Sequence, residues 1–179
     1  MLGDSFLKPE DAIESWDVRP GDKIADFGCG SGFFTIPMAQ RVGPHGTIYA
    51  IDVRQEALDA ARTKMKLFRL TNIDLIRADL EMPHGTGLKD ESVDKTVITN
   101  ILFQVHDKNA LVREASRILR PDGSLLLVEW SDDTSGGPVL PGKVTRKEAE
   151  KLCADAGFST YKDFYAGSHH YGIIFKRSQ

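Results

Sequence analysis

Three glycines at alternate positions, Gly28, Gly30 and Gly32, follow a short apolar run and precede a segment that can form a helix. Glycine adopts positive φ freely and has no Cβ atom, so a ligand can approach such a turn closely. Asp26 precedes the glycines, and Asp52 ends the next apolar run. A strand, a glycine-rich turn and the free amide groups at a helix start together predict a nucleotide-binding site.

The spacing of the glycines argues against a dinucleotide. The fingerprint G-x-G-x-x-G needs a later glycine where pyrophosphate sits on the helix start, and this chain has Phe33 at that position. The carboxylate of Asp52 can accept both hydroxyls of an adenosine ribose, while Val53 offers an apolar edge to adenine. The pattern therefore favours an adenosine without phosphates.

Residues 26–32, DFGCGSG, match the first motif, D-x-G-x-G-x-G, of the class I S-adenosylmethionine-dependent methyltransferases, and the chain resembles this family. Residues 77–83, 92–102 and 115–127 resemble, in the same order, later segments of its ubiquinone-biosynthesis-type and related small-molecule members. The resemblance implies an α/β, Rossmann-like fold: a seven-stranded, mostly parallel sheet with helices on both faces and a C-terminal antiparallel hairpin. It also implies S-adenosyl-L-methionine as cofactor and S-adenosyl-L-homocysteine as product.

The resemblance implies a cofactor-binding role for residues in several of these segments. One aspartate approaches the methionine end of the cofactor, a second takes the ribose hydroxyls, and a third takes the adenine amino group. The competing interpretations are structural, because an aspartate can instead cap a helix or form a turn. The residues implied are Asp26 at the methionine end, Gly28, Gly30 and Gly32 in the turn, Asp52 with Val53 at the ribose and adenine, Asp79 with Leu80 at the adenine, and Asn100 in the methionine pocket.

The implied reaction is a direct in-line displacement at an activated sulfonium methyl group. The protein must mainly bring the acceptor close to the methyl group and exclude water. An acceptor that needs deprotonation also needs a general base. His106 is the first candidate, because it follows the fourth predicted strand in the region that faces the methyl group in the resembling enzymes. A surface or helix-capping histidine is the competing interpretation.

Absent patterns restrict the acceptor. Residues 99–102 read TNIL, not the N/D-P-P-Y/F pattern of enzymes that methylate exocyclic amino groups of bases. The two cysteines are too far apart in the chain to suggest an arsenite site. His169 and His170 would point to opposite faces of a strand, so we expect no metal site. A small organic acceptor, methylated on O, N or C, is the favoured class.

Two alternatives to an independent methyltransferase stay open. The chain has no cap domain over the site and no compelling base, which is consistent with a cofactor-binding module that lacks independent catalysis and acts as a partner subunit. The Rossmann-like start is also shared by NAD-type oxidoreductases, although Phe33 opposes that interpretation.

Strands and helices alternate in the predicted order. Short apolar runs rich in β-branched residues predict buried parallel strands, and apolar positions at helical spacing predict the crossover helices. The segment 81–91 contains Pro83, Gly85 and Gly87 and is expected to be mostly loop. The predicted strands are 23–27, 47–53, 73–76, 93–99 and 124–129, with a hairpin of 158–165 and 171–176; the predicted helices are 9–16, 34–41, 55–70, 108–119 and one from the capping box at Thr145 to Gly157.

The length of 179 residues fits one domain, 1–179, with a short N-terminal segment over 1–20 and a candidate lid loop over 131–143. The start lacks the basic and apolar regions of a signal peptide, and no run suits a membrane span. We therefore expect a soluble, cytoplasmic protein with free thiols. The net charge of −3 argues against nucleic acid as the main partner. Closure of the site by a second subunit makes a homo-oligomer plausible.

Overall fold

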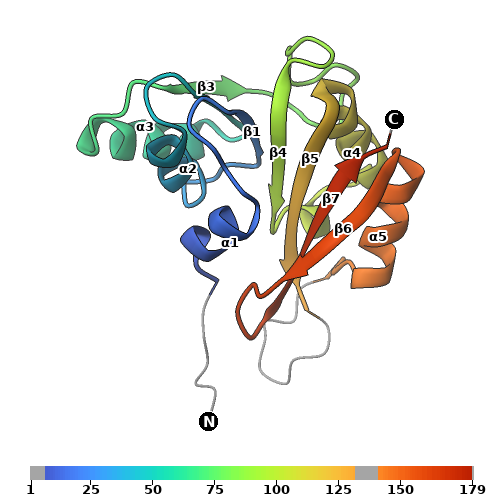
Figure 1. Ribbon diagram of the computed structural model, residues 1–179. Helices are drawn as coiled ribbons and strands as arrows, with labels where there is room; N and C mark the ends of the chain where they lie inside the picture. Colours follow the sequence, from blue (N-terminus) through green and yellow to red (C-terminus); the bar gives the residue numbers. More distant parts are fainter. Residues whose placement is uncertain (1–6, 132–140, 179) are drawn as a thin grey trace.

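The computed structural model describes residues 7–131 and 141–178. In chain order the elements are α1 (Pro9–Ser15), β1 (Lys23–Phe27), α2 (Thr35–Val42), β2 (Thr47–Asp52), α3 (Gln55–Leu67), β3 (Ile73–Arg77), β4 (Val93–Thr99), the 3-10 helix η1 (Leu102–Gln104), α4 (Lys108–Ile118), β5 (Leu119–Trp130), α5 (Arg146–Asp155), β6 (Phe158–Phe164) and β7 (His170–Arg177). The strands form one seven-stranded sheet in the order β3-β2-β1-β4-β5-β7-β6 (Figure 1).

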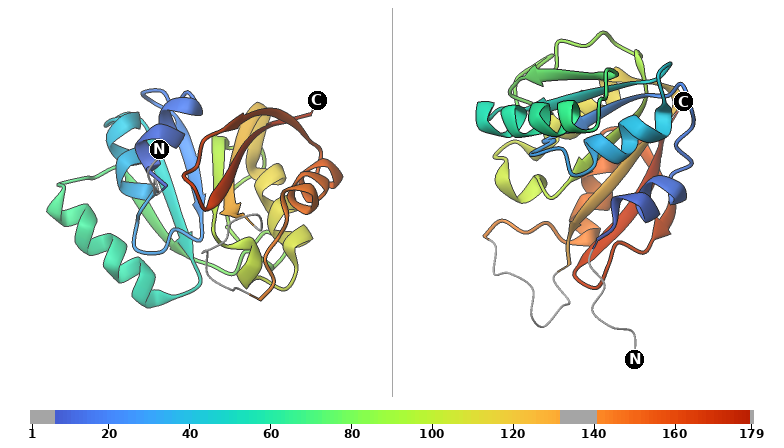
Figure 2. Two further views of the ribbon diagram at one scale, coloured as in Figure 1. Left: turned by 90° about the horizontal axis from the view of Figure 1, so that it is seen from below. Right: turned by 90° about the vertical axis from the view of Figure 1, so that its left-hand side faces the viewer.

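The first five strands pair in parallel, whereas β7 pairs antiparallel with both β5 and β6. Side chains alternate between the two faces of each strand, and helices cover both faces (Figure 2). On one face Ile24 packs in a cluster with Met38 of α2 and Leu58 of α3. On the other face Phe27 packs in a cluster with Leu111 of α4. The predicted Rossmann-like α/β fold is therefore confirmed.

Most element boundaries agree with the predictions to within a few residues, and two differ for identifiable reasons. The helix predicted over 55–70 ends at Leu67, because Arg69 takes a left-handed backbone conformation with φ of 54°. The strand predicted over 124–129 is longer, because β5 also pairs with the start of β4 across an irregularity. The capping box is confirmed: Thr145 Oγ1 accepts the Glu148 N–H at 3.2 Å, and the Glu148 carboxylate accepts the Thr145 N–H at 2.8 Å.

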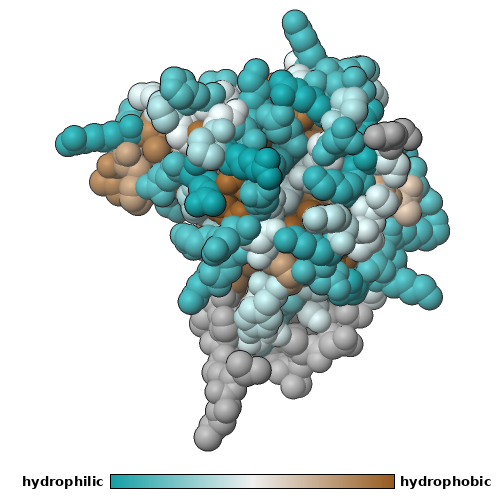
Figure 3. Space-filling model, viewed as in Figure 1, coloured by the Kyte–Doolittle hydropathy of each residue, from teal (hydrophilic) through white to brown (hydrophobic). Residues whose placement is uncertain are grey.

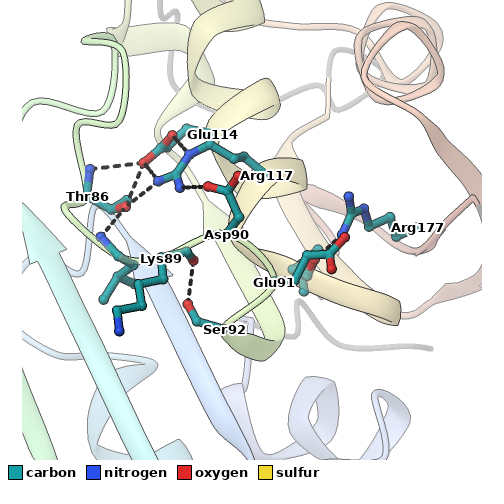
Figure 4. A network of polar contacts seen from close by, with 10 residues as sticks. Thr86, Lys89, Asp90, Glu91, Ser92, Glu114, Arg117 and Arg177 are labelled. Carbon is teal, nitrogen blue, oxygen red and sulfur yellow. Dashed lines mark hydrogen bonds and ion pairs between the residues drawn. The ribbon is translucent and has the colours of Figure 1, made fainter.

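The segment 81–91 forms turns instead of a helix, as predicted, and side chains of α4 hold it in place (Figure 4). Glu114 Oε1 accepts hydrogen bonds from the Thr86 N–H at 3.1 Å and the Thr86 hydroxyl at 2.6 Å. Arg117 donates to Glu114 Oε2 at 2.8 Å and also pairs with Asp90. The network therefore joins the segment 81–91 to α4.

Parallel pairing brings the carboxyl ends of β1 to β5 to one edge of the sheet. Phe27 lies beside Ile51 and Ile98, and Asp52 lies beside Arg77. Ligands of open α/β sheets bind at this edge, and the segments that follow these strands contain the predicted site residues. The candidate lid loop over 131–143 also starts here, but its residues 132–140 lie outside the described residues, so the lid stays a prediction.

Hydrophilic side chains dominate the face seen in Figure 3, and an apolar patch lies near α3. At the end of α3, Leu67 and Phe68 are exposed. Within residues 7–131 and 141–178, no helix is long and apolar enough to cross a membrane.

Candidate cofactor site

A cavity of about 190 Å³ lies at the carboxyl edge of the sheet, between the segments that follow β1, β2, β3 and β4. Residues far apart in the sequence meet there because parallel strands of similar length end at the same edge. Several predicted cofactor-binding residues line the cavity: Gly28, Asp52, Val53, Asp79, Leu80 and Asn100. Gly30, Gly32 and Asp26 are not among the lining residues, although the Gly30 N–H donates to Asp52, which is.

The glycine turn needs glycine for two separate reasons. Gly28, Gly30 and Gly32 have φ values of 70°, 53° and 84°, a region that other residues adopt at a cost. A Cβ atom on Gly28 would also lie 2.4 Å from Cδ1 of Ile101, which lines the cavity. Beside Gly30 there is open space within 4 Å. The backbone is thus open to a ligand at Gly30 and closely packed at Gly28.

The Asp52 carboxylate is fixed at the end of β2 and is 4% exposed. Its Oδ2 accepts the Gly30 N–H at 3.0 Å, which ties the glycine turn to β2. Its Oδ1 accepts the Arg54 N–H at 2.9 Å, and the Arg54 guanidinium lies 3.3 Å from the same oxygen. The Arg54 guanidinium also lies 3.5 Å from Oδ2, so a ribose hydroxyl at either oxygen would replace a long contact with Arg54. Arg54 was not among the predicted residues.

Asp26 lies buried in β1 and is 1% exposed. Its Oδ2 accepts the Thr35 hydroxyl at 2.5 Å, and its Oδ1 has no partner among the described residues. Burial raises the pKa of this carboxyl to about 7. A cationic group placed at Oδ1 would satisfy the unpaired atom and favour the ionised form. This environment fits the amino group at the methionine end of S-adenosylmethionine.

Asp79 follows β3 and forms a turn, as one of its two interpretations predicts, while its contact with adenine stays a prediction. Its Oδ1 accepts the Glu81 N–H at 2.9 Å, which is an Asx turn, and the residue also lines the cavity. Leu80 beside it is buried and apolar. The Glu81 carboxylate accepts the backbone N–H groups of His106 at 3.0 Å and Asp107 at 2.6 Å. Glu81, which the sequence did not single out, therefore joins the loops after β3 and β4.

His106 does not contribute to the cavity lining. Its side chain is exposed, and its backbone N–H is the group that contacts Glu81. The capping role at α4 belongs to Asp107, whose Oδ1 accepts the Ala110 N–H at 2.8 Å. Of the competing interpretation, the surface position of His106 is confirmed and the helix-capping role is wrong, while its role as general base stays a prediction.

Glu129 supports the loop that lines the site and was not predicted from the sequence. It is 1% exposed, and its Oε1 accepts the backbone N–H groups of Ile101 at 2.9 Å and Leu102 at 2.7 Å. Burial raises the pKa of this carboxyl to about 7. One feature of the sequence could have indicated Glu129: it is an acidic residue near the end of an apolar strand. Acidic residues are rarely buried without a specific partner.

The glycine turn, the two buried aspartates and the strand order together define a class I methyltransferase fold with a site for S-adenosylmethionine. Residues 19–168 match a family described as a methyltransferase domain, and the chain belongs to that family. The predicted membership of the class I S-adenosylmethionine-dependent methyltransferases is confirmed, and S-adenosyl-L-methionine is the cofactor that this membership implies.

Similar proteins agree with this assignment. The chain is 30% identical over 164 residues to an uncharacterized 37.1 kDa protein in a transposon of Streptomyces fradiae, covering 82% of this chain and 46% of that protein. It is 29% identical over 129 residues to a demethylmenaquinone methyltransferase of Bacillus mycoides, covering 72% of this chain and 53% of that enzyme. The chain thus spans about half the length of the curated relatives it matches.

The fold also has a close counterpart among solved structures. A SAM dependent methyltransferase from Aquifex aeolicus superposes with a TM-score of 0.87 at 21% identity, covering 96% of this chain and 90% of that one. At this identity the likeness shows the fold.

Proposed function

We propose that this chain transfers the methyl group of S-adenosyl-L-methionine to a small organic acceptor by direct in-line displacement. The observation that carries the proposal is the convergence of Gly28, Asp52, Asp79 and Asn100 on one cavity. Asp26, whose Oδ1 has no partner in residues 7–131 and 141–178, supports it, because this carboxyl is near enough to Asp52 for the two charges to interact. A satisfied structural aspartate would not leave a buried oxygen without a partner.

Each residue has a distinct part in this proposal. Asp52 binds the ribose hydroxyls, Val53 and Leu80 contact the adenine, and Asp79 accepts the adenine amino group. Asp26 pairs with the amino group at the methionine end. When bound, the cofactor supplies an activated methyl group, so the protein contributes mainly positioning and exclusion of water.

The acceptor class is supported by the relatives and by the sequence. The matching relatives include demethylmenaquinone methyltransferases, whose acceptors are small molecules by name. The pattern at 99–102 is not that of an amino-methylating base enzyme. We therefore infer a small organic acceptor, with the accepting atom left as O, N or C.

The first experiment is a calorimetric titration of the protein with S-adenosylmethionine, S-adenosylhomocysteine and NADH. We expect micromolar binding of the two sulfur nucleosides and loss of that binding in Asp52→Ala. Asp59→Ala is the matched control, because Asp59 lies on the exposed surface of α3 and pairs with Arg62. Binding of NADH alone would contradict the proposal.

Transfer is then measured with S-adenosylmethionine labelled in the methyl group and a panel of phenols, hydroquinones and amines. Label in an acceptor, dependent on Asp52, supports catalysis by this chain. Cofactor binding without transfer to any acceptor would instead favour the cofactor-binding module that needs a partner subunit.

A further inference from the structure

Trp130 and His170 form an aromatic pair at the carboxyl edge of the sheet. Trp130 ends β5, His170 begins β7, and the two are direct partners in the antiparallel register. Their ring centroids are 4.1 Å apart, with the ring planes at 34°. Both residues are half-buried, so part of the pair remains accessible.

Asn100 connects this aromatic pair to the cofactor cavity. The residue lines the cavity, and its Nδ2 lies 3.2 Å from Nε2 of His170. Its backbone has φ of 52°, an unfavourable conformation that surrounding contacts must maintain. The Asn100 N–H donates to the Val128 carbonyl at 2.9 Å, and its own carbonyl accepts the Gln104 amide at 2.7 Å. The side chain is therefore held between the cavity and the pair.

One polar atom of the Asn100 amide is left unsatisfied. Its Oδ1 is buried and has no hydrogen-bond partner in residues 7–131 and 141–178. An amide turned the other way round would leave its nitrogen unpaired in the same place. Leaving such a group unpaired in a buried place is unfavourable. A ligand hydroxyl, which both donates and accepts, would satisfy the amide in either orientation.

The surroundings of His170 disfavour a cationic ligand. Burial, together with smaller effects of the neighbouring His169 and Lys143, lowers the pKa of the His170 ring to about 4. The carboxylate of Glu129, on the adjacent strand, is already engaged by two backbone N–H groups of the loop after β4. Among the described residues on the strands that hold the pair, a cation placed here would lose hydration and would find the Glu129 carboxylate already hydrogen-bonded.

The aromatic pair lies on the same face of the sheet as Asp26. Ile24, Val128 and Ile174 belong to one core cluster and so share a face of the sheet. Side chains an even number of residues apart in a strand lie on the same face. Asp26 is two residues from Ile24, Trp130 two from Val128, and His170 four from Ile174, so all three lie on that face. The adenosine-binding residues lie after β2 and β3, and Asp26 lies in β1. The acceptor must therefore approach from the side of β4, β5 and β7.

We propose that Asn100, Trp130 and His170 form the acceptor subsite, and that this subsite binds an uncharged planar ring carrying a hydroxyl group. The ring packs against the aromatic pair, the hydroxyl bonds to the Asn100 amide, and His170 acts as a positioning residue for that amide. The inference rests on the proposed methyl transfer and specifies its acceptor.

The test follows the imidazole signals of His170 by NMR in protein saturated with S-adenosylhomocysteine. The probes are 2-naphthol, its methyl ether, which cannot donate a hydrogen bond, and naphthylmethylammonium, which is cationic. We expect 2-naphthol to shift the His170 signals saturably and to bind about tenfold more tightly than either other probe, the equivalent of about 1.4 kcal/mol.

Variants separate positioning from packing. His170→Phe keeps a ring beside Trp130 but removes the partner of Asn100, so we expect about tenfold weaker binding of 2-naphthol, followed by tryptophan fluorescence. His170→Gln offers an amide to Asn100 and should restore most of that binding. His45→Phe, at an exposed turn far from the site in the chain, should change nothing. The affinity for S-adenosylhomocysteine should stay the same in all three.

The outcomes distinguish this inference from the proposed function. If S-adenosylhomocysteine binds but 2-naphthol leaves the His170 signals unmoved, the acceptor subsite is wrong and the cofactor site stands. Equal binding of 2-naphthol by His170→Phe and the unmodified protein would also overturn it. Failure of S-adenosylhomocysteine to bind would overturn the proposed function itself.

Discussion

The carboxylate of Glu129 accepts a hydrogen bond from the backbone N–H of Leu102 at 2.7 Å. Through this bond and a second to the N–H of Ile101, the end of β5 determines the path of the loop after β4. That loop places the Ile101 side chain against Gly28, where it forms part of the cofactor cavity. A buried acid without contact to the cavity thus shapes the cavity wall.

Replacement of Glu129 by alanine should weaken both the fold and cofactor binding. Two buried N–H groups would lose their acceptor, so we expect a loss of about 2–3 kcal/mol in the free energy of unfolding and weaker binding of S-adenosylhomocysteine. Urea unfolding and calorimetry measure the two effects. Glu129→Gln keeps an oxygen acceptor and should recover most of both. Unchanged affinity in Glu129→Ala would show that the loop is held by other contacts.

Cofactor binding should depend on pH through Asp26. Burial raises the pKa of this carboxyl to about 7, so the acid is largely protonated below that value and ionised above it. In the proposed function the ionised form pairs with the cationic amino group of the cofactor, so the affinity for S-adenosylhomocysteine should rise between about pH 6 and pH 8. Asp26→Asn should bind weakly with a flat profile. The same slope in Asp26→Asn would assign the dependence to another group.

Asp26 should also make the free energy of unfolding of the cofactor-free protein depend on pH, in the opposite direction to cofactor affinity. The folded-state pKa of Asp26 lies above the unfolded value of 3.8, so the folded state binds more protons between these values. The free energy of unfolding should therefore fall as pH rises from about 4 to 7. Urea unfolding at several pH values measures this, and Asp26→Asn should reduce the slope. An unchanged slope in that variant would contradict the assignment.

Gly28→Ala should be more damaging than alanine at another glycine with positive φ. Both changes strain the backbone by about 1 kcal/mol or more, but only at Gly28 would the new Cβ atom meet Ile101. Gly157→Ala is the control, because φ is 86° there and no atom lies within 4 Å of the added group. We expect weaker binding of S-adenosylhomocysteine only for Gly28→Ala, with partial recovery when Ile101→Ala is added. Equal effects at the two glycines would rule out the contact.

The Glu114 network should make the fold sensitive to acid. Burial opposes ionisation of Glu114, but hydrogen bonds from Arg117 and Thr86 outweigh it and hold the pKa of the carboxyl below its usual value. Its stabilising contribution is therefore present above the unfolded-state pKa and is lost as pH falls through the folded-state pKa. At neutral pH we expect Glu114→Ala to lose about 2–4 kcal/mol in urea unfolding.

The control for the Glu114 network is the exposed pair of Lys151 and Asp155 on α5. Lys151→Ala should change the free energy of unfolding by less than about 1 kcal/mol, because exposed ion pairs contribute little. If both variants lowered the free energy of unfolding by the same small amount, the network in Figure 4 would contribute no more to stability than an exposed ion pair.

The sequence by itself determined the elements of the sheet and most of the cofactor-site candidates. Strands, crossover helices and the capping box at Thr145 depend on periodicity and neighbouring residues, which are local properties. The glycine turn and Asp52 each come at the end of a predicted parallel strand. The carboxyl ends of parallel strands lie at one edge of the sheet, so the two were expected to lie close together. The family resemblance added Asp79 and Asn100 to Gly28 and Asp52, and all four line one cavity.

Only the tertiary structure decided which distant residues contact the loops around the cavity and which predicted residues lie outside it. Glu129 meets Leu102 across 27 positions, and Asn100 meets His170 across 70. Such contacts depend on strand order and on backbone conformations such as the left-handed Asn100, which no local pattern indicates. His106 illustrates the converse: its place after β4 suggested a base, but the loop presents its backbone to Glu81 and leaves its side chain exposed.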